Sequence, residues 1–376
     1  MLFKKKEYTA GKSLSAHAWK KFRKNRLAFA SLLFIILVAL IAILGYLITP
    51  DPSPMANSQH LEIARQKPGF SVDMLKLNRQ GIQENRNLFG KMLFGQYHGY
   101  REIPVGGYRI EGDNIFITEF TAVAVESSKE ITYQLDELSD QNPQNSIHKR
   151  TFLLGTDRYG RDLLSRLMIG ARVSLSVGFI SVAISLLIGI SLGAISGFFR
   201  GWLDNLIVWL INVVWSIPTL LLVIAITFAL GKGFWQVFIA VGLTMWVEVA
   251  RVVRGQILSI REKEFVEAGR ALGFKNFRII FRHILPNIMG PVIVISAANF
   301  ASAILIEAGL SFLGIGVQPP MPSWGTMIKE NYAYIILDSA YLAILPGLAI
   351  MFMVLAFMIV GNGLRDALDP RLRGTI

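Results

Sequence analysis

The residue types on which most enzymes depend are scarce or poorly spaced in this sequence. The 376 residues include no cysteine, which excludes thiolate nucleophiles, cysteine metal sites and disulfides. The five histidines include no pair at the i, i+4 spacing of a zinc-binding helix. Lys232 lies in Leu-Gly-Lys-Gly, without the G-x-x-x-x-G-K-[ST] spacing of a phosphate-binding loop. We therefore expect no enzyme activity, no catalytic residue, no metal and no cofactor.

One segment, Glu264 to Asn287, has residues whose types and spacing indicate a specific interaction. Its sequence, EFVEAGRALGFKNFRIIFRHILPN, predicts a short helix over 264–272 that stops at Gly273, then a second, basic helix that ends at Pro286. On the first helix, apolar residues at i, i+3, i+6 and i+7 form one face: Phe265, Ala268, Ala271 and Leu272. Such a face usually docks, either on the chain's own membrane helices or on a separate protein.

The composition indicates that these elements belong to a membrane protein. Hydrophobic residues make up 53% of the chain and charged residues only 17%, whereas water-soluble domains have about 25% charged residues. The net charge of +12 could indicate nucleic-acid binding, but the basic residues lie beside long apolar runs. That placement favours membrane topology and predicts no nucleic-acid partner.

Apolar runs long enough to cross a bilayer predict six transmembrane helices, because about 20 residues span its hydrocarbon core. The third contains Pro218, which should kink it or mark a packing feature. The fourth is short, so a re-entrant segment is the alternative. For the first, an uncleaved anchor is favoured over a signal peptide because its apolar stretch is long. The expected spans are 27–48, 173–199, 206–230, 234–247, 288–306 and about 340–360.

Basic residues close to the spans predict the orientation of the chain. They are concentrated in the N-terminal segment 1–26, in the loop after the fourth span, and in the tail 364–376. The segment Thr49 to Arg150 mixes its charges and is slightly acidic. A six-span model with both termini in the cytoplasm places every basic region inside and the mixed segment outside. We therefore expect a multi-pass protein of the cytoplasmic (inner) membrane, with the lipid bilayer as a partner.

Residues 49–152 form a polar insert between the first two spans. Two alternating runs around Gly112-Asp113-Asn114 predict a β-hairpin, and a small, mostly β domain is expected. Its role is either passive surface or docking of a substrate-delivery protein. Residues 153–172 follow, with an apolar face at Leu163, Leu164, Leu167 and Met168 and polar residues Arg161, Asp162 and Arg166 opposite. This pattern predicts an amphipathic helix at the outer interface, or a merely structural connector.

Small residues recur every four positions along the second span. Such a stripe allows close approach of another helix backbone. The partner helix could belong to this chain or to a second subunit, and the sequence leaves both open. The stripe consists of Ser181, Ser185, Gly189, Gly193 and Gly197.

The segment Glu264 to Asn287 resembles the EAA loop of ATP-binding cassette importer permeases, in which EAA is followed by glycine and then by I-x-LP. Glu267 and Ala268 match, as do Gly273 and Leu285-Pro286 at the expected spacing, whereas Gly269 replaces the second alanine and His283 the isoleucine. Four further stretches are similar to the C-type permease of the dipeptide/oligopeptide branch: KKFRKNRLAFASLL, GTDRYGRDLLSRLMIGARVSL, EAGLSFLGIGVQPPMPSWGTMI and GLRDALDPRLRG. The resemblance covers the chain except for most of the insert, which is longer than that branch implies.

This resemblance implies a fold, partners and site residues. The fold is an all-α membrane protein of the type I importer kind, with a permease core over 173–363 and a cytoplasmic coupling loop over 253–287. The partners are a second homologous permease, two ATP-binding cassette ATPases that hold the ATP, and an extracytoplasmic substrate-binding protein. The residues that contact the ATPase would be Glu264, Phe265, Glu267, Ala268, Gly269, Ala271, Leu272, Gly273, Leu285 and Pro286.

The implied function is inward transport of di- or oligopeptides, or of related solutes such as nickel chelates or sugar derivatives, by alternating access. The strongest alternative is a self-sufficient secondary transporter, which usually keeps ionisable residues at mid-membrane. Here Asp204, Glu248 and Glu307 lie near span ends, and Glu307 is interpreted as structural or gating. A membrane-anchored enzyme is a further alternative, but the insert offers no nucleophile or metal spacing.

Overall fold

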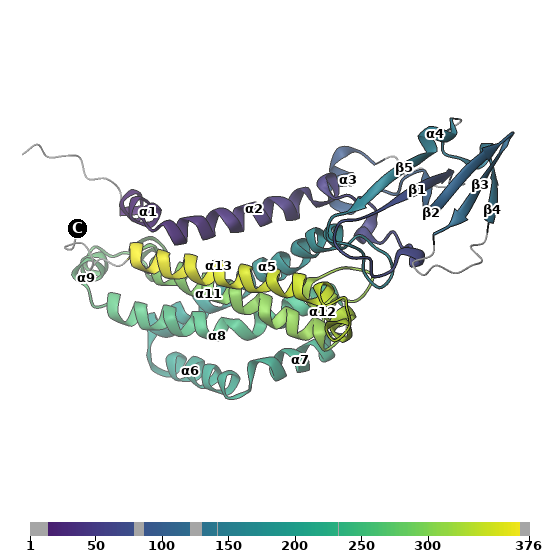
Figure 1. Ribbon diagram of the computed structural model, residues 1–376. Coiled ribbons are helices and arrows are strands. Elements are labelled where there is room, and N and C mark those ends of the chain that lie inside the picture. Colours follow the sequence, from purple (N-terminus) through teal and green to yellow (C-terminus); the bar gives the residue numbers. More distant parts are fainter. Residues whose placement is uncertain (1–13, 79–85, 121–129, 141, 232, 369–376) are drawn as a thin grey trace, which may run out of the picture.

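The computed structural model of the chain describes residues 14–78, 86–120, 130–140, 142–231 and 233–368. Figure 1 shows a bundle of long helices and, projecting from one end, a β-sheet. We call this end the sheet end, and the opposite end, where α9 lies, the α9 end. The elements are α1 (Leu14–Lys24), α2 (Arg26–Ile48), β1 (Phe70–Asn78), α3 (Leu88–Phe94), β2 (Tyr100–Glu111), β3 (Asn114–Glu119), β4 (Glu130–Gln134), α4 (Pro143–Ser146), β5 (Ile147–Phe152), α5 (Leu163–Phe199), α6 (Gly201–Ser216), α7 (Thr219–Leu230), α8 (Phe234–Ile260), α9 (Glu264–Ala271), α10 (Asn276–Arg278), a π-helical turn (Ile279–Ile284), α11 (Leu285–Phe312), α12 (Trp324–Asn331) and α13 (Tyr341–Leu368), with short 3₁₀ turns at Pro54–Ala56, Leu61–Ile63, Leu135–Glu137 and Tyr332–Ile335.

Every predicted span falls on helix, but the third is divided between two helices. In the described chain, five helices are long and apolar enough to cross a membrane, or six if α6 and α7 together form one span. These two helices meet at 95°. The break falls at Ile217, whose backbone is extended (φ −93°, ψ 129°), just before Pro218. Proline disfavours the helical conformation of the residue before it, so the predicted kink is a full break.

The fourth span is a complete helix and not a short or re-entrant segment. We predicted that its apolar run ends at Val247, yet α8 has 27 residues. Two arginines beyond that point have partners on α6. The Arg254 guanidinium donates to Asp204 at 2.7 and 2.8 Å, and the Arg251 guanidinium lies 3.5 Å from the centroid of the Trp215 ring. Because these charges are satisfied by α6, the helix continues past them.

A separate interfacial helix over 153–172 is absent from the described chain, and this prediction needs correction. Residues 153–162 follow β5 as a loop, and α5 then begins at Leu163 and runs without interruption for 37 residues. The Asp162 side chain caps it by accepting from the backbone N–H of Ser165 at 2.7 Å. Arg161 and Arg166, which we expected on a water-facing side, are each only 2% exposed. They are buried because acidic partners surround them, as described below.

The stripe of small residues on α5 packs against α8 of the same chain. A Cβ atom at Gly189 would lie 2.7 Å from the carbonyl oxygen of Trp246, and one at Gly193 would lie 2.5 Å from that of Ala250. The Ser181 hydroxyl donates to the backbone carbonyl of Phe238 at 3.0 Å. The stripe therefore serves packing within this chain, which decides between the two alternatives left open by the sequence.

This contact predicts a strong effect of adding one methyl group to α5. We expect Gly193→Ala to destabilise the protein by about 1–3 kcal/mol, because the facing α8 backbone must move. Gly255→Ala on α8 is the matched control, since a Cβ there meets open space and alanine favours the helix by about 1 kcal/mol. Thermal unfolding in detergent should separate the two variants. Equal melting temperatures would contradict the close packing of α5 on α8.

The insert forms a five-stranded antiparallel sheet, as its alternating pattern predicted. The strand order is β4-β3-β2-β1-β5. The predicted hairpin joins β2 to β3 through Gly112 and Asp113, with Glu111 paired to Asn114, and Gly112 takes the positive φ (+62°) that this turn requires. One face of the sheet is closed by a buried cluster of Leu75, Val105, Ile115, Ile117 and Leu138. The sheet therefore has a core of its own beyond the helices (Figure 1).

Candidate functional site

The helix α9 has well-defined ends that follow from its sequence. Glu264 and Glu267 lie in its first turn and Arg270 in its last, which is the favourable arrangement for the helix dipole. Gly273 has φ +75° and its N–H donates to the carbonyl of Arg270 at 2.9 Å. A left-handed residue at this place is most easily a glycine. The predicted helix and its stop at Gly273 thus appear as expected.

The base of α9 is formed by Val266, which the sequence analysis did not single out, and by Gly269, which we predicted as a contact residue and which faces the chain's own helices instead. Val266 is only 1% exposed and belongs to a buried cluster with Phe198 of α5, Ile257 of α8 and Ile279 of the π turn. One turn later, Gly269 is also buried, and a Cβ there would meet the Phe274 ring at 3.4 Å. The i, i+3 spacing of Val266 and Gly269 was the available signal. This base fixes α9 on the ends of three long helices.

The opposite face of α9 is the predicted apolar face, and it points away from the rest of the chain. Phe265 is 43% exposed and Leu272 is 72% exposed. The chain's own helices were one of two possible docking partners for this face, and the described residues leave it uncovered. We call this exposed surface the α9 surface; it consists of Phe265, Ala268, Ala271 and Leu272.

Two charged groups lie on α9 beside the α9 surface, and two exposed aromatic rings follow later in the same loop. Glu264 and Glu267 are exposed, and within the described residues neither side chain has a hydrogen-bond or ion-pair partner. The rings of Phe277 and Phe281 are in contact, with centroids 4.2 Å apart and planes tilted by 32°, and both are likewise exposed. The sequence analysis missed this aromatic pair, although its i, i+4 spacing was a signal. Together these groups offer an apolar patch with unpaired carboxylates.

The predicted helix end at Pro286 is wrong, because the chain stays helical from Asn276 to Phe312. Proline removes a donor from the helix and clashes with the carbonyl of residue i−4. The turn Ile279–Ile284 is π-helical, and the Leu285 N–H donates to the carbonyl of Ile280, five residues back. This wider turn absorbs the proline. Leu285 and Pro286, which we predicted as contact residues, lie at the base of α11, half-buried and exposed respectively.

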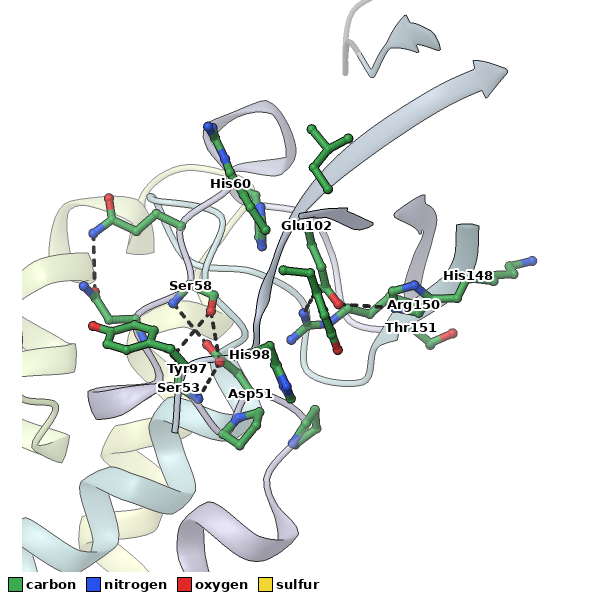
Figure 2. A pocket seen from close by; sticks show the side chains of 18 of the residues that line it. Asp51, Ser53, Ser58, His60, Tyr97, His98, Glu102, His148, Arg150 and Thr151 are labelled. Carbon is green, nitrogen blue, oxygen red and sulfur yellow. Dashed lines mark hydrogen bonds and ion pairs between the residues drawn. The ribbon is translucent and has the colours of Figure 1, made fainter. Parts of the chain in front are cut away.

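A second candidate site lies at the sheet end, where the insert meets the bundle. An open cavity of about 1010 Å³ lies between β2, β5 and the chain that follows α2, and Figure 2 shows side chains that line it. Glu102 bridges two groups on its wall, the Arg150 guanidinium at 2.5 Å and the His148 Nε2 at 3.4 Å. Burial lowers the pKa of His60 below its ordinary value, and Arg150 lowers it further. In the described chain no group of histidine and acidic side chains is arranged to hold a metal ion.

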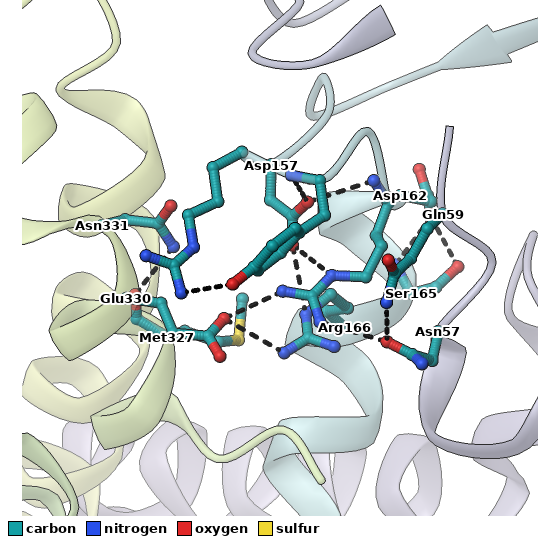
Figure 3. Close-up of polar contacts among 12 residues, drawn as sticks. Asn57, Gln59, Asp157, Asp162, Ser165, Arg166, Met327, Glu330 and Asn331 are labelled. Carbon is teal, nitrogen blue, oxygen red and sulfur yellow. Dashed lines mark hydrogen bonds and ion pairs between the residues drawn. The ribbon is translucent and has the colours of Figure 1, made fainter. Parts of the chain in front are cut away.

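Beside this cavity, buried charges join the insert to the bundle (Figure 3). Arg161 donates to Asp157 at 2.6 Å and to Glu330 of α12 at 2.9 Å. Arg166 of α5 lies 3.5 Å from each of the same two carboxylates. Arg161 also donates to the Asn57 side chain at 3.1 Å. We call Asp157, Arg161, Arg166 and Glu330 the ion cluster; its two positive and two negative groups balance.

Glu307, the acidic residue on α11, has polar partners inside the chain. It is completely buried, and its carboxylate accepts from Ser311 at 2.7 Å and from Ser174 of α5 at 3.2 Å. These contacts tie α5 to α11 near the sheet end. The interpretation of Glu307 as structural or gating stays a prediction.

Two family models match the chain. Residues 189–374 match the binding-protein-dependent transport system inner membrane component, and residues 13–68 match the N-terminal transmembrane domain of oligopeptide transport permease C. The first match includes α9 and the helices on which it rests. Residues 69–188, which include the five strands of the sheet, lie outside both matches.

Several relatives are similar over most of their length. The dipeptide transport system permease of Alkalihalophilus pseudofirmus is 40% identical over 69% of this chain and 84% of its own. The di/tripeptide permease of Pseudomonas aeruginosa is 45% identical over 59% of this chain and 73% of its own. A solved inward-facing structure of a methionine ABC transporter covers 55% of this chain and 98% of its own, at 19% identity and a TM-score of 0.47.

Proposed function

Because this chain belongs to the family of binding-protein-dependent transport system inner membrane components, we propose that it carries peptides into the cell as one of two permease subunits of an importer. It is a permease of the ATP-binding cassette class, a transport protein rather than an enzyme, and it lies in the inner membrane as a multi-pass protein. Such permeases work with ATPase and binding-protein partners. The substrate class is proposed from the relatives, whose names specify dipeptides, di- and tripeptides, oligopeptides and glutathione.

The observation that carries this proposal is the α9 surface. An exposed apolar patch rimmed by unpaired carboxylates is costly unless a partner covers it. We infer that this partner is an ATP-hydrolysing subunit, with the α9 surface seated in a groove on it. Glu264 and Glu267 would then bond to polar groups at the edge of the groove, and Gly273, Leu285 and Pro286 would hold the loop and its following helix in place.

The base of α9 accounts for how motion would reach the membrane. Val266 packs with Phe198 and Ile257, which lie near the α9 ends of α5 and α8. Arg261 adds a bond from its guanidinium to the carbonyl of Phe198 at 2.7 Å. When two ATPases approach each other on binding ATP, a seated α9 would move with its ATPase and pull these helix ends along. Alternating access then follows from displacement of the α9 ends of α5, of α8 and of the helix that continues into α11.

The same proposal includes the orientation of the chain in the membrane and the number of its partner subunits. The α9 end would face the cytoplasm, where ATP is available, and the sheet would lie outside. Basic residues support this orientation, since α1 and the loop around α9 are both rich in lysine and arginine. We propose one second permease, two ATPases and one external binding protein for each complete importer.

Site-specific photo-crosslinking tests the proposal. A photoreactive residue at Leu272 should yield a covalent product with a protein that contains a phosphate-binding loop, identified by mass spectrometry after mild extraction from native membranes. Ile336 is the matched control, because it is an exposed apolar residue (92%) near the sheet end. Crosslinking from Leu272 only to lipid or to other copies of this chain would contradict an ATPase partner.

A further inference from the structure

The short helix α3 carries an apolar face that the rest of the insert does not cover. Phe89 is 70% exposed and Phe94 is 63% exposed, and Leu88 and Leu93 are exposed as well. Asn87 caps the helix by accepting from the backbone N–H of Gly90 at 2.9 Å. Four large apolar side chains within seven residues are an unusual surface for a polar domain in water.

The position of α3 is fixed by Arg172 of α5. Its guanidinium donates to four backbone carbonyls: those of Ala42 and Ile43 on α2 at 2.8 and 2.9 Å, and those of Met92 and Leu93 on α3 at 2.7 and 2.8 Å. Ala42 is six residues before the end of α2 at Ile48, which corresponds to about 9 Å along the helix axis. The C-terminal end of α3 therefore lies beside the last turns of a membrane span and not beyond them.

The turn that follows α3 fixes its direction as well. Gly95 has φ +70°, and a Cβ there would lie 2.6 Å from the carbonyl oxygen of Pro52 and 3.0 Å from the Tyr46 ring. The Tyr46 hydroxyl in turn accepts from the backbone N–H of Met55 at 3.0 Å. The chain after α3 is thus pressed against the end of α2, and α3 cannot move away from it freely.

The bonds from Arg172 are those that a helix end needs inside a bilayer. The last carbonyls of a helix have no partner within the helix, and in hydrocarbon each unsatisfied carbonyl costs several kcal/mol. Water would satisfy Met92 and Leu93 in an external domain, whereas here an arginine does so. The helix α3 lies beside α2, and α2 has exposed apolar side chains of its own at this end, Ile43, Leu44, Leu47 and Ile48.

We propose that α3 is a membrane-interface helix whose exposed apolar side chains, Leu88, Phe89, Leu93 and Phe94, insert into the phospholipid leaflet at the sheet end. It continues the lipid-facing surface of α2 and holds the insert against the bilayer. Lys91, in the same helix, would extend its ammonium group to the phosphate layer, as lysines at membrane interfaces do. The insert is therefore anchored to lipid at one end and free at its β2–β3 hairpin.

Fluorescence quenching by brominated lipids tests this placement, and the absence of native cysteine makes single labelling sites simple to prepare. The full chain with Phe89→Cys carries a bimane probe and is reconstituted into vesicles of brominated phosphatidylcholine. We expect a loss of fluorescence comparable to that at Leu40→Cys on the exposed face of α2, and none at Ile110→Cys on the hairpin. A probe at Phe89 that stays as bright as the one at Ile110 would overturn the proposal.

Arg172 provides the second test. In Arg172→Ala the end carbonyls of α3 lose their donor, so we expect quenching at Phe89 to fall while quenching at Leu40 stays the same. Unchanged quenching at Phe89 would show that Arg172 does not hold α3 in the leaflet. A quenching signal that disappears when partner proteins from the native membrane are co-reconstituted would show that a protein covers α3, and would also overturn the proposal.

Discussion

Replacing Glu267 with arginine is expected to abolish peptide uptake while the protein still inserts into the membrane. Glu267 is exposed at the edge of the α9 surface, and its carboxylate has no partner within the described chain. In the proposed interface with the ATPase, a cation at this place would be desolvated beside groups arranged for an anion. An unpaired charge of this kind costs about 2–5 kcal/mol, which weakens association at least about tenfold. Uptake of a radiolabelled dipeptide and recovery of the ATPase with the tagged chain measure both effects.

The same charge reversal at the other end of the molecule is the control. Glu111→Arg changes an exposed carboxylate on the β2–β3 hairpin, whose nearest ionic partner is Arg109 at 3.5 Å. Exposed pairs of this kind contribute about 0–1 kcal/mol, so uptake and ATPase recovery should stay normal. Normal uptake in Glu267→Arg would argue against a coupling role for α9 even if ATPase recovery were reduced.

The membrane helices were predictable because the hydrocarbon core of a bilayer requires the side chains of a span to be apolar. A run of about 20 apolar residues satisfies this requirement regardless of what packs alongside. Apart from the break before Pro218, the predicted helix ends differed from the structure where charged residues lie next to such runs. Whether the helix ends before Arg254 or continues past it depends on the partner of Arg254. That partner, Asp204, lies 50 positions earlier in the sequence. Arg166 was likewise placed in water because its partner, Glu330, lies on α12.

The position of the candidate site could be predicted from the sequence. Which side of α9 packs against the bundle could not. The helix and its stop at Gly273 follow from the local sequence. α9, however, has apolar residues on two sides, and spacing does not say which side packs against the bundle. Val266 does so because Gly269, one turn later, lets the helix approach Phe274 and Ile279. Pro286 was misjudged for a similar reason, since a π turn before it is not visible in residue types.

Replacing Glu330 with glutamine is expected to destabilise the sheet end more than any exposed substitution in the insert. The ion cluster is balanced, and the change leaves Arg161 and Arg166 with Asp157 as the remaining acid of the cluster. Removing one partner of a buried ion pair costs about 3–5 kcal/mol, because a charge is left buried without compensation. We expect a lower melting temperature and faster proteolysis of the chain around Asn57, which Arg161 holds at 3.1 Å.

Two further variants show whether the effect of Glu330→Gln comes from the unbalanced ion cluster or merely from the loss of one carboxylate. Glu130→Gln removes an exposed partner of Arg109 on the sheet and should change stability by no more than about 1 kcal/mol. Arg166→Met combined with Glu330→Gln removes one charge of each sign, so the double variant should be more stable than Glu330→Gln alone. If Glu330→Gln and Glu130→Gln melt at the same temperature, the ion cluster does not hold the insert to the bundle. In that case the neutral hydrogen bonds of this junction would hold the insert, among them the His60 N–H to the Tyr159 carbonyl at 3.0 Å and the Tyr341 hydroxyl to the Gln66 carbonyl at 2.7 Å.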